Sequence, residues 1–233
     1  GIDRSKCIGC TQCVEACPSE AIKRWGEHMT VEEVMKVIEK DRKYYERSGG
    51  GMTVSGGDPL VQHEFTRELL KASREAGIHT CLESTFYADW DIIADTVQYA
   101  DLLISDVKHM DSEIHKKYTG MGCEQILDNL AHLAREGHEM ILRIPVIPGI
   151  NDDMENITRT ADFLESQIGS SLRTLQLLSF MRMGEEKCAS LGRPYEMKDL
   201  EFDREEFQKK VEGIADYFNS RGIHCVVGTK EKE

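Results

Sequence analysis

The sequence alternates short apolar, β-branched runs with amphipathic stretches of helical period, and this alternation restricts the fold more than any other feature. The apolar runs, of which the last is the weakest, cover residues 52–55, 78–83, 102–106, 140–147, 174–180 and 223–227. The helical stretches cover residues 30–47, 65–76, 90–100, 123–136, 153–168 and 203–221. Strands that alternate with helices form right-handed βαβ crossovers, so the sequence predicts an α/β fold with a parallel sheet.

The number of runs decides how the sheet closes. Five clear strands and a weak sixth are too few for a closed barrel of about eight strands. We therefore predict an open, partial (β/α)6 parallel barrel, with a doubly wound sheet as the alternative. In the barrel, we expect a first strand that precedes Gly1.

Polar residues collect where the predicted strands end. They are found at residues 56–58, 83–85 and 106–108, at Arg143, and at residues 179–181. Parallel α/β architectures place their sites at the carboxyl ends of the strands. The sequence therefore predicts that these residues share one pocket.

A run of four cysteines lies close to the N-terminus. Cys7, Cys10, Cys13 and Cys17, which Pro18 follows, have the spacing CxxCxxCxxxCP. This spacing is typical of ferredoxin-type [4Fe-4S] ligation, in which the fourth cysteine serves a second cluster. A zinc knuckle, the alternative, would favour two separated CxxC pairs or added histidine. We expect residues 1–28 to be the remnant of a ferredoxin-like insert and residues 29–233 to form the barrel.

The composition narrows the class of protein. The 233 residues include 42 acidic and 29 basic side chains, for a formal net charge of −13. Such a charge repels phosphates, which argues against nucleic acid as a partner. No apolar run has the length of about 20 residues that a membrane span needs, so no membrane partner is expected either. Unpaired cysteines held for iron fit a reducing, anaerobic cytoplasm.

Several motifs in this order resemble those of the radical S-adenosylmethionine (SAM) enzymes and, more narrowly, of the activating enzymes of glycyl-radical enzymes. The matching segments are residues 7–18, 55–60, 106–111, 118–120, 143–149, 151–153, 177–178, Gly184 and 191–193. Residues 55–60 read SGGDPL in place of the family's usual SGGEPL. The resemblance covers nearly all of residues 7–228.

The resemblance implies a function. In its full-length form such an enzyme reductively cleaves SAM to a 5′-deoxyadenosyl radical and generates a glycyl radical on a partner enzyme. The implied cofactors are [4Fe-4S] clusters and SAM, with a monovalent cation as a further candidate. The implied partners are the glycine loop of a glycyl-radical enzyme and an electron donor of the flavodoxin or ferredoxin type.

The resemblance also implies site residues. Gly56 and Gly57 would let the backbone approach the methionine part of SAM, because a Cβ there would block close contact. Asp58 stands where the family has Glu, so its contact with the amino group would be longer or pass through water. Asp106, Val107 and Lys108 form the DVK segment, in which Lys108 is a candidate for the carboxylate of SAM and Asp106 for the ribose or a cation.

Further positions follow from the same comparison. Glu83 and Ser84, together with Asp106, are candidate ligands of a monovalent cation. Arg143 interrupts an apolar strand, so a carboxylate or a ligand is expected to meet its guanidinium. Met181 lies where many relatives have histidine, and a thioether packs against adenine without the hydrogen bond of histidine. Phe86 occupies a place where glycine is common.

One family motif does not occur. The CxxxCxxC that holds the cluster at the SAM site is not found in this sequence, so we expect the chain alone to bind the insert cluster poorly and not to cleave SAM. Two other functions stay open. One is a ferredoxin-like electron-transfer protein, which would need no cofactor pocket, and the other is a radical SAM enzyme that acts on a small molecule or peptide.

Overall fold

The computed structural model describes residues 2–3, 5–24 and 26–229. Six parallel strands form one sheet in the order β1-β2-β3-β4-β5-β6. Their bounds are β1 Gly51–Val54, β2 His79–Glu83, β3 Leu102–Asp106, β4 Met140–Val146, β5 Leu172–Ser179 and β6 Cys225–Val227. All six predicted strands are confirmed.

Helices connect the strands, while α2 and α3 precede β1 and α2 packs on α4. The helices at the predicted positions are α2 Val31–Ile38, α3 Arg42–Ser48, α4 His63–Glu75, α5 Trp90–Val97, α7 Glu124–Arg135, α8 Met154–Phe163 and α10 Arg204–Ser220. Helix α4 packs on β1 and β2, and α10 packs on β5 and β6. A π-helical turn, Leu164–Ile168, extends α8.

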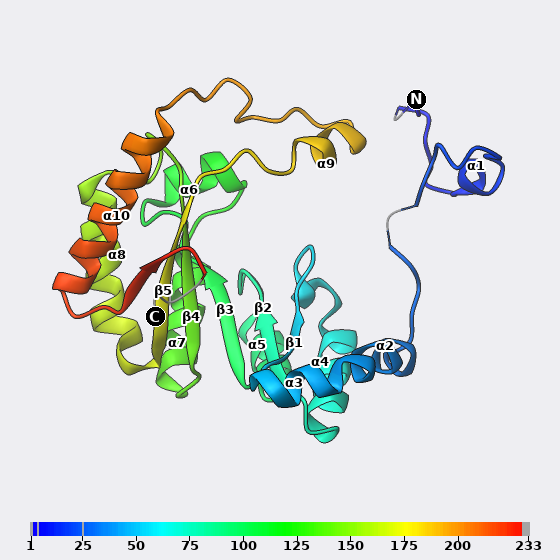
Figure 1. Ribbon diagram of the computed structural model, residues 1–233, viewed down its shortest axis with the longest axis horizontal. Coiled ribbons are helices and arrows are strands. Elements are labelled where there is room, and N and C mark those ends of the chain that lie inside the picture. Colours follow the sequence, from blue (N-terminus) through cyan, green and yellow to red (C-terminus); the bar gives the residue numbers. More distant parts are fainter. Residues whose placement is uncertain (1, 4, 25, 230–233) are drawn as a thin grey trace.

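The strand order decides between the two predicted architectures. Every strand pairs with its neighbour in the chain, and all pairs are parallel. A doubly wound sheet would reverse direction at a switch point, and the described sheet contains no such reversal. The fold is therefore the open, partial barrel, with its strands running side by side in Figure 1.

Within residues 2–3, 5–24 and 26–229, helices cover only one face of this sheet. Along β4, the buried residues Met140, Leu142, Ile144 and Val146 alternate with the partly exposed Ile141, Arg143 and Pro145. Because side chains alternate between the two faces of a strand, the first set joins the core under the helices. The second set lies on the opposite, concave face.

The helix predicted over residues 30–47 begins as expected but is not continuous. Its capping box is present, since the Glu33 amide donates to Thr30 Oγ1 (3.2 Å) and the Thr30 amide donates to Glu33 Oε2 (2.8 Å). A 3-10 turn, Glu39–Asp41, then separates α2 from α3. Arg42 at the start of α3 donates to the carbonyl of Ala76 (2.9 Å), which ties α3 to the end of α4.

Three short helices were not predicted. They are α1 Gln12–Glu15, α6 Ser112–Thr119 and α9 Glu185–Ser190. Helix α6 begins at Asp111, whose carboxylate accepts from the Ile114 amide (2.9 Å). The segment with α1 stands apart from the barrel in Figure 1. The proposed boundary between residues 28 and 29 stays a prediction, and residues 1, 4 and 25 of the proposed insert lie outside the described residues.

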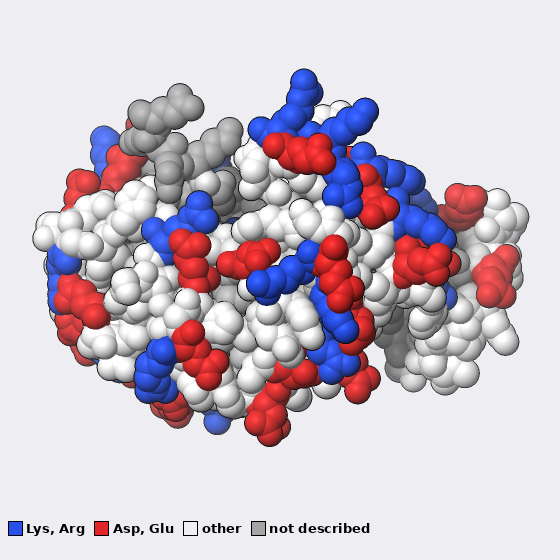
Figure 2. All heavy atoms as spheres, turned by 90° about the horizontal axis from the view of Figure 1, so that it is seen from below, with Lys and Arg blue, Asp and Glu red and all other residues white. Residues whose placement is uncertain are grey.

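The face at the amino ends of the strands is seen in Figure 2, where acidic and basic side chains are interspersed. The net charge of −13 therefore does not produce a field of one sign on this face. Within the described part of the chain, none of the helices combines the length and the apolar character needed to cross a membrane.

The first strand contains a glycine that packing requires. A Cβ on Gly51 would overlap the carbonyl oxygen of His79 in β2. We expect Gly51→Ala to lower the free energy of unfolding by about 3 kcal/mol, because the two strands must separate to admit the methyl group.

The matched control is Gly213→Ala in the middle of α10, where a Cβ would meet no atom within 4 Å. This change should raise stability by up to about 1 kcal/mol through the better helix propensity of alanine. Urea unfolding of both variants is the measurement. Equal stability of the two variants would contradict the packing argument.

Candidate functional site

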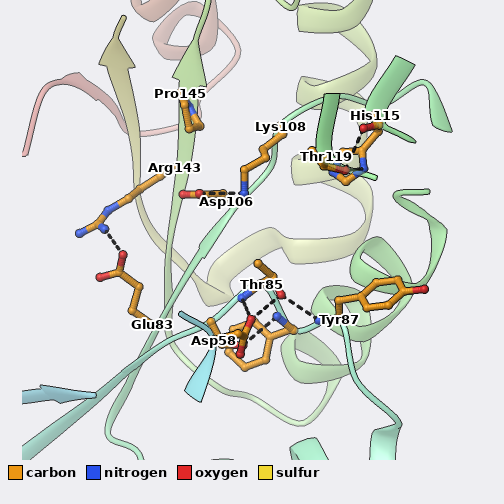
Figure 3. A network of polar contacts seen from close by, with 12 residues as sticks. Asp58, Glu83, Thr85, Tyr87, Asp106, Lys108, His115, Thr119, Arg143 and Pro145 are labelled. Atoms are coloured by element: carbon orange, nitrogen blue, oxygen red, sulfur yellow. Dashed lines mark hydrogen bonds and ion pairs between the residues drawn. The ribbon is translucent and has the colours of Figure 1, made fainter. Parts of the chain in front are cut away.

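The concave face carries a line of polar side chains contributed by neighbouring strands. Arg143 of β4 holds Glu83 of β2 through an Nη1–Oε1 contact of 3.0 Å and donates from Nε to Gln176 Oε1 of β5 at 3.1 Å. The guanidinium is one-fifth exposed, at 19%. The expected partner of Arg143 is thus a carboxylate, and it is Glu83 (Figure 3).

The strand register explains why only long side chains make this contact. Glu83 is level with Ile104, which is level with Ile141, whereas Arg143 lies two residues further along β4. Neighbouring strands are about 4.8 Å apart, so the Arg143 side chain reaches across β3 to meet Glu83. A guanidinium with its fork of donors suits such a bridge better than a lysine.

A second ion pair lies at the end of β3. Lys108 Nζ is 3.1 Å from Asp106 Oδ2, and both side chains are about one-third exposed, at 37% and 32%. Asn151 fixes the backbone here, because its Nδ2 donates to the carbonyls of Lys108 (2.9 Å) and Pro145 (2.8 Å). Val107, between Asp106 and Lys108, is buried in the core, and its amide donates to the carbonyl of Arg143 (2.8 Å).

The glycine turn follows β1. Gly56 has a φ of +130°, and a Cβ on Gly56 or on Gly57 would meet no atom within 4 Å. The space beside this backbone is therefore open, as the close approach of a ligand requires. Asp58 directly after the turn places its carboxylate against Ser84 and Thr85 at the end of β2.

The predicted cation ligands are already engaged with protein groups. Glu83 pairs with Arg143, Asp106 pairs with Lys108, and the Ser84 hydroxyl donates to Asp58 Oδ1 (2.8 Å). Among the residues the structure describes, no three acidic, histidine or cysteine side chains are grouped so that they could hold a metal. The cation site stays a prediction.

Met181 lies beyond β5 and is more than half exposed. It begins an excursion over residues 180–203 that contains α9, and a cavity of about 590 Å³ is lined by residues 180–183, 200–202 and Arg204. Edge-to-face contacts among Phe180, Phe202 and Phe207 close the base of this excursion. A contact of Met181 with adenosine stays a prediction.

The cysteines of the N-terminal run are free thiols at the surface. Cys7, Cys10 and Cys13 are exposed and Cys17 is partly exposed. A hydrogen bond from the Ser19 hydroxyl, followed by backbone amides, lowers the pKa of the Cys17 thiol, which favours the thiolate that iron binds. This donor set fits an iron-sulfur cluster in its chemistry, while its assignment rests on spacing because the side chains are not gathered.

The other cysteines differ from this run. Cys81, Cys123 and Cys225 are buried, as small apolar residues are, and burial raises the pKa of the Cys225 thiol to about 12. Cys188 in α9 is partly exposed. The described structure thus separates thiols suited to metal binding from thiols that fill the core.

Sequence reasoning placed Thr85 among the polar strand ends and Asn151 in a matching motif but gave neither a role, and it missed Asn129 and Gln176. All four hold the strand ends by hydrogen bonds. A buried amide within an apolar helix face, as at Asn129, is a usable signal because such a group needs hydrogen-bond partners. No comparable signal marks Gln176.

An open parallel barrel with a polar concave face and a glycine turn at its carboxyl edge is the architecture of radical SAM enzymes. The Radical SAM superfamily matches residues 5–161 of the chain. The (2S)-3-sulfopropanediol dehydratase activating enzyme of Klebsiella oxytoca is 58% identical over 231 residues, which are 99% of this chain and 73% of that protein. The 4-hydroxyphenylacetate decarboxylase activating enzyme of Clostridioides difficile is 38% identical over 97% of this chain and 71% of its own length.

Solved structures agree with this assignment. A domain of the pyruvate-formate lyase-activating enzyme from Bacteroides vulgatus aligns with a TM-score of 0.62 and 29% identity over 77% of this chain and 99% of that domain. SuiB of Streptococcus suis, bound to S-adenosylmethionine, has a TM-score of 0.66 at 14% identity over 90% of this chain and 45% of SuiB, and shows likeness of fold alone. The chain belongs to the radical SAM superfamily and, within it, to the activating enzymes of glycyl-radical enzymes.

Membership of this family implies a [4Fe-4S] cluster and SAM as cofactors, which when bound supply one-electron bond cleavage and hydrogen abstraction. The residues of this chain would bind and orient SAM. The contacts of SAM with Gly56, Gly57 and Lys108 stay predictions, since the backbone at the two glycines is open and Lys108 is paired with Asp106. Arg143, fixed by Glu83 and Gln176, keeps the floor of the concave face polar and rigid.

The cysteine assignment yields a prediction. Cys13→Ala should lower the iron and sulfide content of the anaerobically reconstituted protein, because a [4Fe-4S] cluster needs its thiolate ligands. Cys188→Ala, which removes a partly exposed thiol outside the run, is the control and should leave both contents unchanged. Iron and sulfide assays measure the effect, and an equal loss in the two variants would count against the assignment.

Proposed function

We propose that this chain activates a glycyl-radical dehydratase of the kind named for its Klebsiella relative, by docking that large enzyme on the carboxyl edge of the barrel. The observation that carries the proposal is a rim of exposed, large apolar side chains along this edge. The rim residues are Val61, Tyr87, Ile114, Tyr118, Met121, Met154, Met181, Met183 and Leu191.

The rim draws on every loop that follows the first five strands. Val61 comes after β1, Tyr87 after β2, and Met154 after β4 at the start of α8. Helix α6 and the loop behind it contribute residues after β3, and the excursion over residues 180–203 contributes those after β5. Exposed apolar residues are ordinary when scattered, but here each follows the carboxyl end of one of these strands.

The rim favours a macromolecular substrate. A small-molecule site would enclose its apolar groups in a pocket, whereas these side chains are exposed; two of them, Met181 and Met183, also line the cavity of the excursion over residues 180–203. The five rim residues that are not methionine are aromatic or branched. The four methionines supply flexible, polarisable contacts that adapt to a partner's surface. An electron-transfer protein, the alternative, has no need of the open glycine turn within this rim.

The relatives narrow the choice of partner. The named partner of the 58% identical relative is (2S)-3-sulfopropanediol dehydratase. A relative from Nitratidesulfovibrio vulgaris, 39% identical over 89% of this chain and 67% of its own length, is named for isethionate sulfite-lyase. We assign a dehydratase of the first kind because the identity is higher and extends over 99% of this chain.

The proposal includes an electron donor, a cellular compartment and a bound cation. A flavodoxin or ferredoxin-type protein would donate electrons to the cysteine-bound cluster, in the cytoplasm of an anaerobic cell. A monovalent cation at Glu83, Ser84 and Asp106 requires that Asp106 exchange Lys108 for the ion, that Glu83 give up Arg143, and that the Ser84 oxygen bind the ion while its hydroxyl donates to Asp58. If a cation binds there, Asp106→Asn should abolish any stimulation of activity by potassium. The control Asp101→Asn should leave that stimulation unchanged. Steady-state rates measured with and without potassium test this prediction.

The function is tested with two purified candidate partners. The reconstituted full-length enzyme, SAM and a reductant are mixed with sulfopropanediol dehydratase or with isethionate sulfite-lyase. The expected result is a glycyl-radical signal in electron paramagnetic resonance that forms faster on the dehydratase. A signal on neither partner, with SAM still cleaved, would indicate a small-molecule or peptide substrate.

The rim gives a sharper prediction. Met183→Glu should raise the KM for the partner protein about tenfold, because a charge would be buried in the docked complex. Val37→Glu on α2, another exposed apolar position away from the carboxyl edge, is the control. SAM affinity should stay unchanged in both variants, and an unaltered KM for Met183→Glu would remove the rim from the proposal.

A further inference from the structure

Asp58 links two loops that the sequence places far apart. Its Oδ1 accepts from the Ser84 hydroxyl (2.8 Å) and from the Leu60 amide (3.0 Å). Its Oδ2 accepts from the Thr85 amide (3.0 Å) and from the Thr85 hydroxyl (2.5 Å). Figure 3 shows this carboxylate turned toward Thr85. These hydrogen bonds connect the loop after β1 to the end of β2.

These contacts use the full capacity of the carboxylate. An ionised carboxylate offers about four lone-pair sites to donors, and four protein donors fill them. An additional donor, such as an ammonium group, would have to displace one of them. None of the recorded ion pairs of the described residues includes Asp58.

The two hydroxyl donors are themselves committed. Ser84 Oγ accepts from the Phe86 amide (3.0 Å), and Thr85 Oγ1 accepts from the Tyr87 amide (3.3 Å). If either hydroxyl turned away from Asp58 toward a ligand, a backbone amide would lose its partner as well. Such linked hydrogen bonds act as a unit.

The loop after β2 is also fixed from its other side. Asn129 of α7 donates from Nδ2 to the carbonyls of Phe86 (2.8 Å) and Ala88 (3.0 Å). Phe86 has a φ of +53° and a fully buried side chain. A left-handed conformation costs a phenylalanine about 1 kcal/mol or more, so the loop keeps it only because its surroundings enforce it. Asp58 therefore bonds to a rigid anchor.

We propose that Asp58 is a positioning residue that holds the Gly56-Gly57 turn against this anchor, and that its carboxylate does not itself receive the amino group of SAM. The inference rests on the proposed function in one respect, namely that the glycine turn holds SAM. The one-methylene difference from Glu gives the physical reason. The short side chain keeps the carboxylate within reach of the Ser84 hydroxyl and of the Thr85 amide and hydroxyl, whereas a longer one would extend past them.

The test measures the dissociation constant for SAM in the reconstituted holoenzyme, without turnover, for Asp58→Asn, Thr85→Val and the double variant. Each single change should weaken SAM binding about tenfold, and the double variant should be no weaker than the worse single, because both changes break the same contact. Thr85→Ser keeps the hydroxyl and should bind as the unmodified enzyme does. A direct contact to the amino group would instead leave Thr85→Val close to unmodified and make the two effects multiply.

Asp58→Glu separates the two roles further. A direct ligand should be retained or improved by the family's usual residue, whereas a positioning residue of this reach should not, so tighter SAM binding by Asp58→Glu overturns the inference. Amide hydrogen exchange at residues 84–88 should accelerate in Asp58→Asn and not in Asp153→Asn, a control in which another helix-capping carboxylate changes. If Asp58→Asn fails to fold, the Thr85→Val and Thr85→Ser pair still decides.

Gly57→Val distinguishes a failure of this inference from a failure of the proposed function. A branched side chain in the open space beside the turn should abolish SAM binding if the turn holds the cofactor. Unchanged binding in Gly57→Val would overturn both the placement of SAM and the inference about Asp58. Lost binding in Gly57→Val together with multiplicative effects at Asp58 and Thr85 would overturn the inference alone.

Discussion

The structure depends on a parallel sheet whose strands follow one another in chain order. Every crossover then returns on the same side, so the helices bury one face and leave the other without a cover. The alternation along β4 records this division, with Leu142 and Ile144 in the core and Arg143 on the open face. A half-covered sheet is costly unless its open face is polar, and this requirement places the site.

The polar groups on the open face are paired rather than free. Arg143 is held by Glu83 and Gln176, and Lys108 by Asp106. Each pair retains some solvent, so its net contribution to stability is modest, about 1 kcal/mol or less. Their larger effect is geometric, because paired long side chains occupy fewer rotamers than free ones. The polar side chains of the open face accordingly hold one another in place.

The strands and most helices could be predicted from the sequence alone, because β-branched runs and helical periods are local signals. Helices α6 and α9 were missed since both carry few apolar residues. The positions of the site residues were predicted from motifs, but the contacts between these residues were not. That Glu83 meets Arg143 follows from the register of three strands, and that Asp58 meets Thr85 follows from the approach of two loops. Neither is encoded within any one stretch of residues.

The backbone conformation of the loop at the edge of the site depends on how the Phe86 ring packs in the interior of the protein. Glycine in this place would adopt the same backbone at little cost and independently of its neighbours, whereas this phenylalanine keeps a left-handed backbone while its ring is enclosed in the core. Residues that line the ring thereby help to set the backbone of the loop as well as to fill the core. A substitution deep under the helices that loosens the ring should therefore displace the loop at the mouth of the barrel, an effect that a glycine in this place would not transmit.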